Sequence, residues 1–199
     1  CPRVAIITGP VDTRHYVRSG DDESGRIVLG WIGSATTLPY LEQIATALGE
    51  VAVHHRQICL RIVGATGPHI AGLSVESAPW ALETELDELR RFHIGLMPLP
   101  DDPWTRGKGG YKLLQYMSMG LPVVSSPVGI NRRIVRHGEN GFLAANAAEW
   151  QHYLGELIEN PHLRREMGAR GRQTVEREYS LETSCTHLLQ IMRETAGLA

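Results

Sequence analysis

The stretch IVLGWIGS, residues 27–34, decides the fold class of this 199-residue chain. Its apolar residues run almost unbroken into a glycine and a serine, as in a strand that is covered on both faces. Similar apolar runs occupy residues 58–63, 94–99 and 122–126, with a weaker one at 73–75. Amphipathic helical stretches separate these runs. The alternation predicts an α/β fold in which a Rossmann-like parallel sheet is flanked by helices.

The helical stretches are identified by apolar residues at i, i+3, i+4 and i+7. Past Gly141 only helices are expected, so the sheet should be followed by a set of C-terminal helices. We predict that residues 1–25 are the end of a preceding domain and a linker, and that residues 26–199 form the Rossmann-like domain. The apolar stripes run along Leu41, Ile44, Ala45 and Leu48, along Leu82, Leu86 and Leu89, and along Leu181, Cys185, Leu188, Leu189 and Met192.

Composition excludes several classes of protein. The 20 Lys and Arg against 22 Asp and Glu lack the basic excess of a protein that follows a phosphate backbone, so nucleic acid is not an expected partner. No apolar run approaches the roughly 18 residues that span a bilayer, so no transmembrane segment is predicted. Three widely spaced cysteines without a C-x-x-C pair favour a reducing, cytoplasmic location.

The turn after residues 27–32 is a candidate phosphate site. Gly33 lets the backbone approach a ligand closely, and Ser34 precedes a helix whose first N–H groups attract an anion. The alternative is an ordinary strand-to-helix turn in which Ser34 caps the helix and nothing binds.

The stretch TRGKGGYK, residues 105–112, is a second candidate anion site. Three glycines stand beside three cations where a helix is predicted to begin near residue 110. Cations there oppose the helix dipole, which makes structural sense if an anion neutralises them. The alternative is a solvated basic loop. The candidate residues are Arg106, Lys108, Gly109, Gly110, Tyr111 and Lys112.

Three further segments carry a resemblance to a known family. QYMSMGLPVV at 115–124, SSPVG at 125–129 and GENGFL at 138–143 resemble the motifs of the group 1 glycosyltransferases, glycosyltransferase family 4. Val11-Asp12-Thr13 resembles the linker turn that enters the second domain of those enzymes. The resemblance implies the GT-B architecture, two Rossmann-like domains facing across a cleft, with this chain as the C-terminal, nucleotide-sugar half.

The resemblance also implies a function. It indicates the donor-binding domain of a retaining glycosyltransferase of carbohydrate biosynthesis, with a nucleoside diphosphate-sugar as substrate and no cofactor or metal. The expected partner is the N-terminal acceptor domain of the same full-length chain, without which this domain should be inactive. The expected location of the protein is the cytoplasm. The alternative is a peripheral location at the inner membrane face, held there through the N-terminal domain.

Two positions depart from the family pattern. The family commonly has two glutamates with seven residues between them, and Gly107 and Gln115 stand in their places. Because an amide can bond a diol, we expect Gln115 to keep the ribose role and Gln115→Glu to be tolerated. Lys108 and Lys112 are the expected catalytic residues, which stabilise the leaving diphosphate electrostatically. The expected substrate-binding residues are Gly33, Ser34, Arg106, Gly109, Gly110, Tyr111 and Gln115.

Two other functions fit the same residues. A sugar-nucleotide-binding module without catalysis would explain Gly107 and Gln115, and a GT-B-type epimerase would need a pair of carboxylates in the cleft. His93, at the start of a predicted strand, is expected to be structural. His54-His55 has no further ligand at a metal-like spacing.

Overall fold

A computed structural model of the chain describes residues 5, 7–18 and 25–197. Its centre is a six-stranded sheet with the order β3-β2-β1-β4-β5-β6, in which every neighbouring pair is parallel. The strands are β1 (Ile27–Ile32), β2 (Ile58–Val63), β3 (Ser74–Ala78), β4 (Ile94–Met97), β5 (Val123–Ser125) and β6 (Phe142–Leu143). The predicted Rossmann-like parallel sheet is therefore confirmed.

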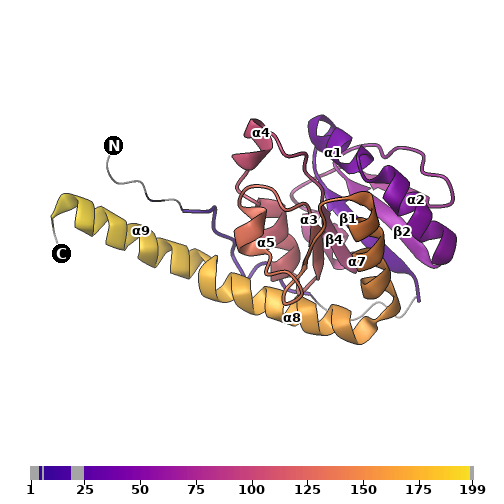
Figure 1. Cartoon of the computed structure of the whole chain (residues 1–199). Coiled ribbons are helices and arrows are strands. Elements are labelled where there is room, and N and C mark those ends of the chain that lie inside the picture. Colours follow the sequence, from indigo (N-terminus) through magenta and orange to yellow (C-terminus); the bar gives the residue numbers. More distant parts are fainter. Residues whose placement is uncertain (1–4, 6, 19–24, 198–199) are drawn as a thin grey trace.

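Helices cover both faces of the sheet (Figure 1). Along β1, Leu29 and Trp31 belong to one buried cluster, with residues of α2 and α7, while Val28 and Ile32 belong to the other, with residues of α3 and α5. The helical elements are η1 (Ala35–Thr37), α1 (Leu38–Glu42), α2 (Ala45–His54), α3 (Glu85–Arg90), α4 (Pro103–Arg106), α5 (Tyr111–Ser118), α6 (Asn131–Ile134), α7 (Ala147–Glu159), α8 (Pro161–Glu178) and α9 (Leu181–Ala196). This double cover explains the continuous apolar runs.

Three local predictions were wrong. Strands do not stop at Gly141, because Phe142–Leu143 pairs with β5, and a two-residue strand is too short to show a period. Leu82 is 69% exposed and lies before α3 instead of on its buried face. The apolar stripe from Leu41 to Leu48 is divided between α1 and α2, although Leu41 and Leu48 are both buried as expected.

The amino-terminal segment, which we define as residues 11–16, packs against the domain. Val11 bridges to Ser180, and the buried Tyr16 reaches toward α3 and α5. The Arg172 guanidinium of α8 donates to the backbone carbonyls of Thr13, Tyr16 and Ser118. Residues 1–4, 6 and 19–24, on which part of the predicted linker falls, lie outside the described residues.

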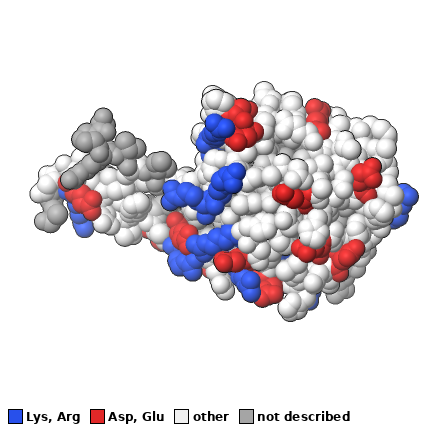
Figure 2. All heavy atoms as spheres, viewed as in Figure 1, with Lys and Arg blue, Asp and Glu red and all other residues white. Residues whose placement is uncertain are grey.

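Helix α9 extends away from the body of the domain (Figure 1). Leu181, Leu188, Leu189 and Met192 are 38–58% exposed, so the apolar stripe predicted for this helix is not covered by the described part of the chain. Figure 2 shows largely uncharged surface along this arm and a gathering of Lys and Arg near the junction of α8 and α9. Within the described part of the chain, no helix is both long and apolar enough to cross a membrane.

Candidate functional site

The candidate site lies where the strand order changes direction. Strand β1 runs into η1 on one side of this point, and β4 runs into the loop that precedes α5 on the other. Ligands of open α/β sheets bind at such switch points, beyond the carboxyl ends of the strands. A cavity of about 940 Å³ opens there, lined by Ile32, Gly33, Ser34, Gly64, Ala65, Thr66, Ser77, Ala78, Pro79, Trp80, Glu85, Tyr111, Lys112 and Gln115. Its size fits a small-molecule ligand.

Gly33 allows a close approach between β1 and α5. A Cβ atom at this position would lie 2.4 Å from Cη2 of the fully buried Trp31 and 2.7 Å from Nζ of Lys112. Any larger residue would therefore push the lysine away from the end of β1. The glycine keeps the backbone of the turn bare and the ammonium group beside it.

Lys112 reaches from the first turn of α5 across the end of β1. Its Nζ lies 4.4 Å from the centroid of the Trp31 ring, a cation–π contact. Burial, and secondarily the positive charge of Lys108, lower its pKa from 10.5 to about 8. Burial therefore disfavours the charged ammonium form of Lys112, and a bound anion would stabilise that form.

Lys108 lies on the other side of the same turn. Its Nζ is 5.4 Å from the centroid of the Tyr40 ring, and a smaller pocket of about 250 Å³ is lined by both lysines together with Gly33 and Ser34. This pocket shares Gly33, Ser34 and Lys112 with the larger cavity. Lys108 and Lys112 are the only two lysines of the sequence, and the fold brings both to the same backbone turn.

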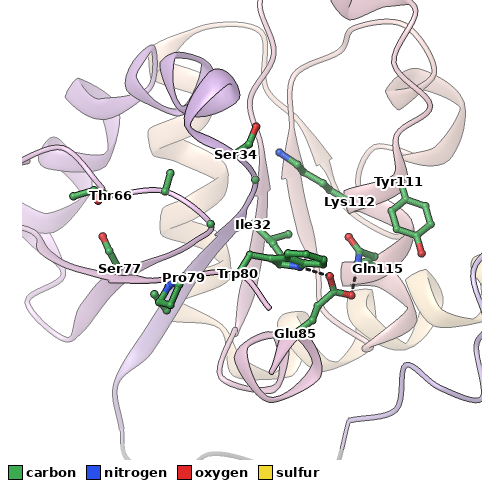
Figure 3. Close-up of a pocket in the computed structure, with 14 residues that line it drawn as sticks. Ile32, Ser34, Thr66, Ser77, Pro79, Trp80, Glu85, Tyr111, Lys112 and Gln115 are labelled. Atoms are coloured by element: carbon green, nitrogen blue, oxygen red, sulfur yellow. Dashed lines mark hydrogen bonds between the residues drawn. The ribbon is translucent and has the colours of Figure 1, made fainter. Parts of the chain in front are cut away.

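A buried carboxylate lies deeper in the larger cavity (Figure 3). Glu85 is 8% exposed and accepts hydrogen bonds from the Tyr16 hydroxyl at 2.7 Å, Trp80 Nε1 at 2.6 Å and Gln115 Nε2 at 2.9 Å. The Gln115 amide also donates to the Tyr16 hydroxyl at 3.0 Å. Burial and the bond to Glu85 raise the pKa of Tyr16 above its ordinary value, so its hydroxyl remains a donor.

The structure brings five of the predicted residues to the larger cavity and one more to the smaller pocket. Gly33, Ser34, Tyr111, Lys112 and Gln115 line the first, and Lys108 lines the second. Arg106, Gly109 and Gly110 are not among the lining residues. Arg106 is exposed and pairs through Nε with Asp101 at 2.6 Å, while Gly110 holds the left-handed backbone that starts α5, with φ of 69°. His93 is buried and its Nδ1 accepts from Val28 N, as expected of a structural histidine.

Sequence reasoning missed Glu85 and Tyr16. An acidic residue in the first turn of a helix is the ordinary partner of the helix dipole, so Glu85 has a local explanation that needs no site. The available signal was its spacing, because Glu85 precedes the fully buried Leu89 by four residues and shares its face. A carboxylate on the apolar face of a helix indicates a buried polar contact.

The sheet order, the double helical cover and the cationic turn at the switch point define a Rossmann-like domain of the type that forms one half of a GT-B glycosyltransferase. The chain belongs to the group 1 glycosyltransferases, since the family model described as "Glycosyl transferases group 1" matches residues 26–160. The fit is to the C-terminal domain of these proteins. The described residues contain no group of three or more His, Cys, Asp or Glu side chains placed to hold a metal ion.

Solved structures share this fold. A glycosyltransferase from Rickettsia africae is 14% identical with a TM-score of 0.77, and the match covers 96% of this chain and 56% of that one. HepE of Anabaena, in complex with UDP and glucose, is 15% identical with a TM-score of 0.74, covering 93% and 55%. The C-terminal domain of the group 1 protein LpcC from Francisella tularensis is 16% identical with a TM-score of 0.69, covering 86% and 99%.

The chain therefore spans little more than half the length of the first two proteins and nearly all of the separate C-terminal domain of the third. These likenesses concern the fold.

Proposed function

We propose that this chain is the donor-binding domain of a retaining glycosyltransferase, which transfers a sugar from a nucleoside diphosphate-sugar to an acceptor. The observation that carries the proposal is the meeting of Lys108 and Lys112 at Gly33 and Ser34, on the edge of a cavity large enough for a nucleotide. Asp101, in the same loop as Lys108, is already paired with Arg106. Two neighbouring ammonium groups at a helix start favour a ligand with two phosphates.

The larger cavity and the smaller pocket suggest where each part of the donor binds. The smaller pocket takes the diphosphate, with the backbone of Gly33 and the Ser34 hydroxyl beside the lysines. The larger cavity takes the nucleoside, with Trp80 and Pro79 as apolar surface for the base. HepE of Anabaena, which shares the fold, is solved in complex with UDP, and this supports a nucleoside diphosphate as the kind of ligand. Arg106, Gly109 and Gly110 stay predicted donor contacts.

The chemistry follows from where charge develops. When the glycosidic bond to the diphosphate breaks, negative charge grows on the leaving phosphate. Lys108 and Lys112 are placed to stabilise that charge, and stabilisation that is stronger in the transition state than in the ground state lowers the barrier. The proposal uses no metal or other cofactor, because the two side chains and the backbone amides supply the positive charge.

Replacing the lysines tests the phosphate assignment. Lys108→Met and Lys112→Met should each weaken the binding of a nucleoside diphosphate by roughly 1–3 kcal/mol, the range for charge-assisted hydrogen bonds. Isothermal titration with UDP, GDP and ADP measures this and identifies the base. Arg56→Met, which removes an exposed cation before β2, is the matched control and should bind normally. Unchanged affinity in both lysine variants would refute the assignment.

The pH dependence of binding gives the same test a second readout. Because the pKa of Lys112 is lowered to about 8, its charge and the affinity should fall as pH rises through that value. In Lys108→Met the pKa of Lys112 should rise, since one cause of its lowering is gone. Carbon-13 methylation of the two lysines makes both titrations visible by NMR. A Lys112 signal that titrates near the ordinary value would contradict this electrostatic picture.

The acceptor side is proposed to come from another domain of the full-length protein. The isolated chain should then bind donor and transfer no sugar, because holding both reactants in a closed cleft supplies about 7–11 kcal/mol of the barrier reduction. A transfer assay with UDP-, GDP- and ADP-sugars on the isolated and the full-length chains measures this. Transfer by the isolated chain at a rate near that of the full-length protein would overturn the two-domain proposal.

A non-catalytic nucleotide-sugar-binding module is the second candidate, favoured by Gly107 and Gln115 at the positions of the family's glutamates. It predicts the same binding and no transfer by the full-length protein. An epimerase is less well supported, because among the described residues that line the cavity Glu85 is the single carboxylate.

A further inference from the structure

The wall of the larger cavity contains a carboxylate that is held entirely by neutral donors. The partners of Glu85 are a phenol, an indole and an amide, and within the described residues no cation forms an ion pair with it. A buried carboxylate costs free energy even with such partners, and an apolar pair of similar size would avoid that cost. Its position on the cavity wall therefore calls for a role toward the ligand.

The orientation of Gln115 is determined by this carboxylate. Glu85 can only accept hydrogen bonds when ionised, so the amide nitrogen must face it. The nitrogen lies 2.9 Å from Glu85 Oε1 and 3.0 Å from the Tyr16 hydroxyl oxygen, and because those two oxygens are only 2.7 Å apart, one N–H is shared between them. The amide oxygen is left on the opposite side of the group, as Figure 3 shows.

Acceptor capacity toward the cavity remains on two atoms. Glu85 Oε1 receives two hydrogen bonds, whereas Oε2 receives one, from Trp80 Nε1. A carboxylate oxygen can accept two, so Oε2 retains one position, and the Gln115 oxygen is available as well. The donors of Tyr16 and Trp80 and one N–H of the Gln115 amide are already committed within this cluster. The site thus offers adjacent acceptors, which match the two hydroxyl donors of a vicinal diol.

We propose that Glu85, with the Gln115 oxygen beside it, binds the ribose 2′,3′-diol of the donor nucleotide. The inference rests on the proposed function and adds a residue from a different element, since Glu85 begins α3 whereas Gln115 belongs to α5. Lys112 and Gln115 lie three residues apart on α5, so they are neighbours on one face of the helix. The same helix therefore positions the phosphate site and one half of the ribose site.

The test compares ribonucleotides with their dideoxy counterparts. UDP, GDP and ADP, each paired with its 2′,3′-dideoxy analogue, are titrated into the wild-type chain, Glu85→Gln and the control Glu83→Gln, whose side chain is exposed in the turn before α3. The wild type and Glu83→Gln should prefer the ribose form about 10- to 100-fold, as expected for hydrogen bonds to a charged acceptor. In Glu85→Gln this preference should fall to within about threefold, while dideoxy binding stays the same.

A double variant keeps the test decisive even if Glu85→Gln folds poorly. Glu85→Gln combined with Gln115→Glu exchanges the carboxylate and the amide across the same 2.9 Å contact and should restore the ribose preference. A purely structural role for Glu85 would change the affinities for both analogues together and leave their ratio intact.

The outcomes separate this inference from the proposed function. If the wild-type chain binds none of the three nucleotides, both fail. If it binds them with no preference for the ribose form, or if Glu85→Gln keeps the full preference, the proposed function stands and the assignment of Glu85 is wrong.

Discussion

Gln115→Glu is expected to destabilise the protein by about 2–4 kcal/mol at neutral pH. The substitution replaces an N–H donor, 2.9 Å from Glu85 Oε1, with a second carboxylate oxygen in a buried site. Two carboxylates in such contact cannot both ionise, so one must stay protonated with a raised pKa. The sequence alone suggested that this change would be tolerated. The presence of Glu85 reverses that expectation.

The sign of the pH dependence checks this explanation. When a carboxyl has a higher pKa in the folded than in the unfolded state, the protein loses stability as pH rises from the unfolded-state pKa through the folded-state pKa. Urea unfolding of Gln115→Glu should therefore approach wild-type stability near about pH 4 and fall behind it toward about pH 7. Gln57→Glu, at an exposed position before β2, is the control. A deficit that does not change with pH would show that packing, not charge, is responsible.

Arg172→Ala is the second change with a large expected effect, a loss of about 2–4 kcal/mol in the free energy of unfolding. The Arg172 guanidinium joins its own helix, α8, to the amino-terminal segment and to α5, since it donates to the carbonyls of Thr13, Tyr16 and Ser118. Removing it leaves these partly buried acceptors without their charged donor. Because one of them belongs to Tyr16, the hydroxyl contact with Glu85 should loosen as well.

Urea unfolding measures the loss, and hydrogen exchange over residues 11–16 locates it. Arg170→Ala removes a surface arginine that forms an ion pair with Glu166 one turn away, and should change stability by less than about 0.5 kcal/mol. Arg172→Lys keeps the charge but lacks the planar guanidinium, so its free energy of unfolding should lie between those of Arg172→Ala and Arg170→Ala. If Arg172→Ala also changes the stability of the wild type by less than about 0.5 kcal/mol, the amino-terminal segment is held by its apolar contacts alone.

Much of the site could be predicted from local sequence because backbone chemistry is local. Gly33 and Ser34 follow directly from an apolar run that ends in a glycine, and Lys108 and Lys112 are placed by the glycines before α5. In a parallel sheet, the loops after two strands meet at one edge whatever the length of chain between them. A parallel sheet therefore places both turns at one edge, and the neighbouring positions of β1 and β4 bring them together.

The position of Arg106 could not be predicted in this way. It lies in the same short loop as Lys108, and the sequence gives both the same charge and the same glycine neighbours. The difference is made by α4, whose Asp102 cap and final turn direct Arg106 toward Asp101. A four-residue helix leaves no periodic signal, so its effect on side-chain direction appears only in the folded chain.

What the sequence by itself determined is the type of fold, the family and the two glycine-bearing turns, because apolar periodicity and glycine placement act over a few residues. Only the tertiary structure decided the composition of the hydrogen-bonded cluster around Glu85. Tyr16, Glu85 and Gln115 are separated by 69 and 30 residues, and they meet because the sheet order places α3 beside α5 and because Arg172 ties the amino-terminal segment to both α5 and α8. A hydrogen bond between such distant residues depends on how whole elements pack, and no local pattern encodes it.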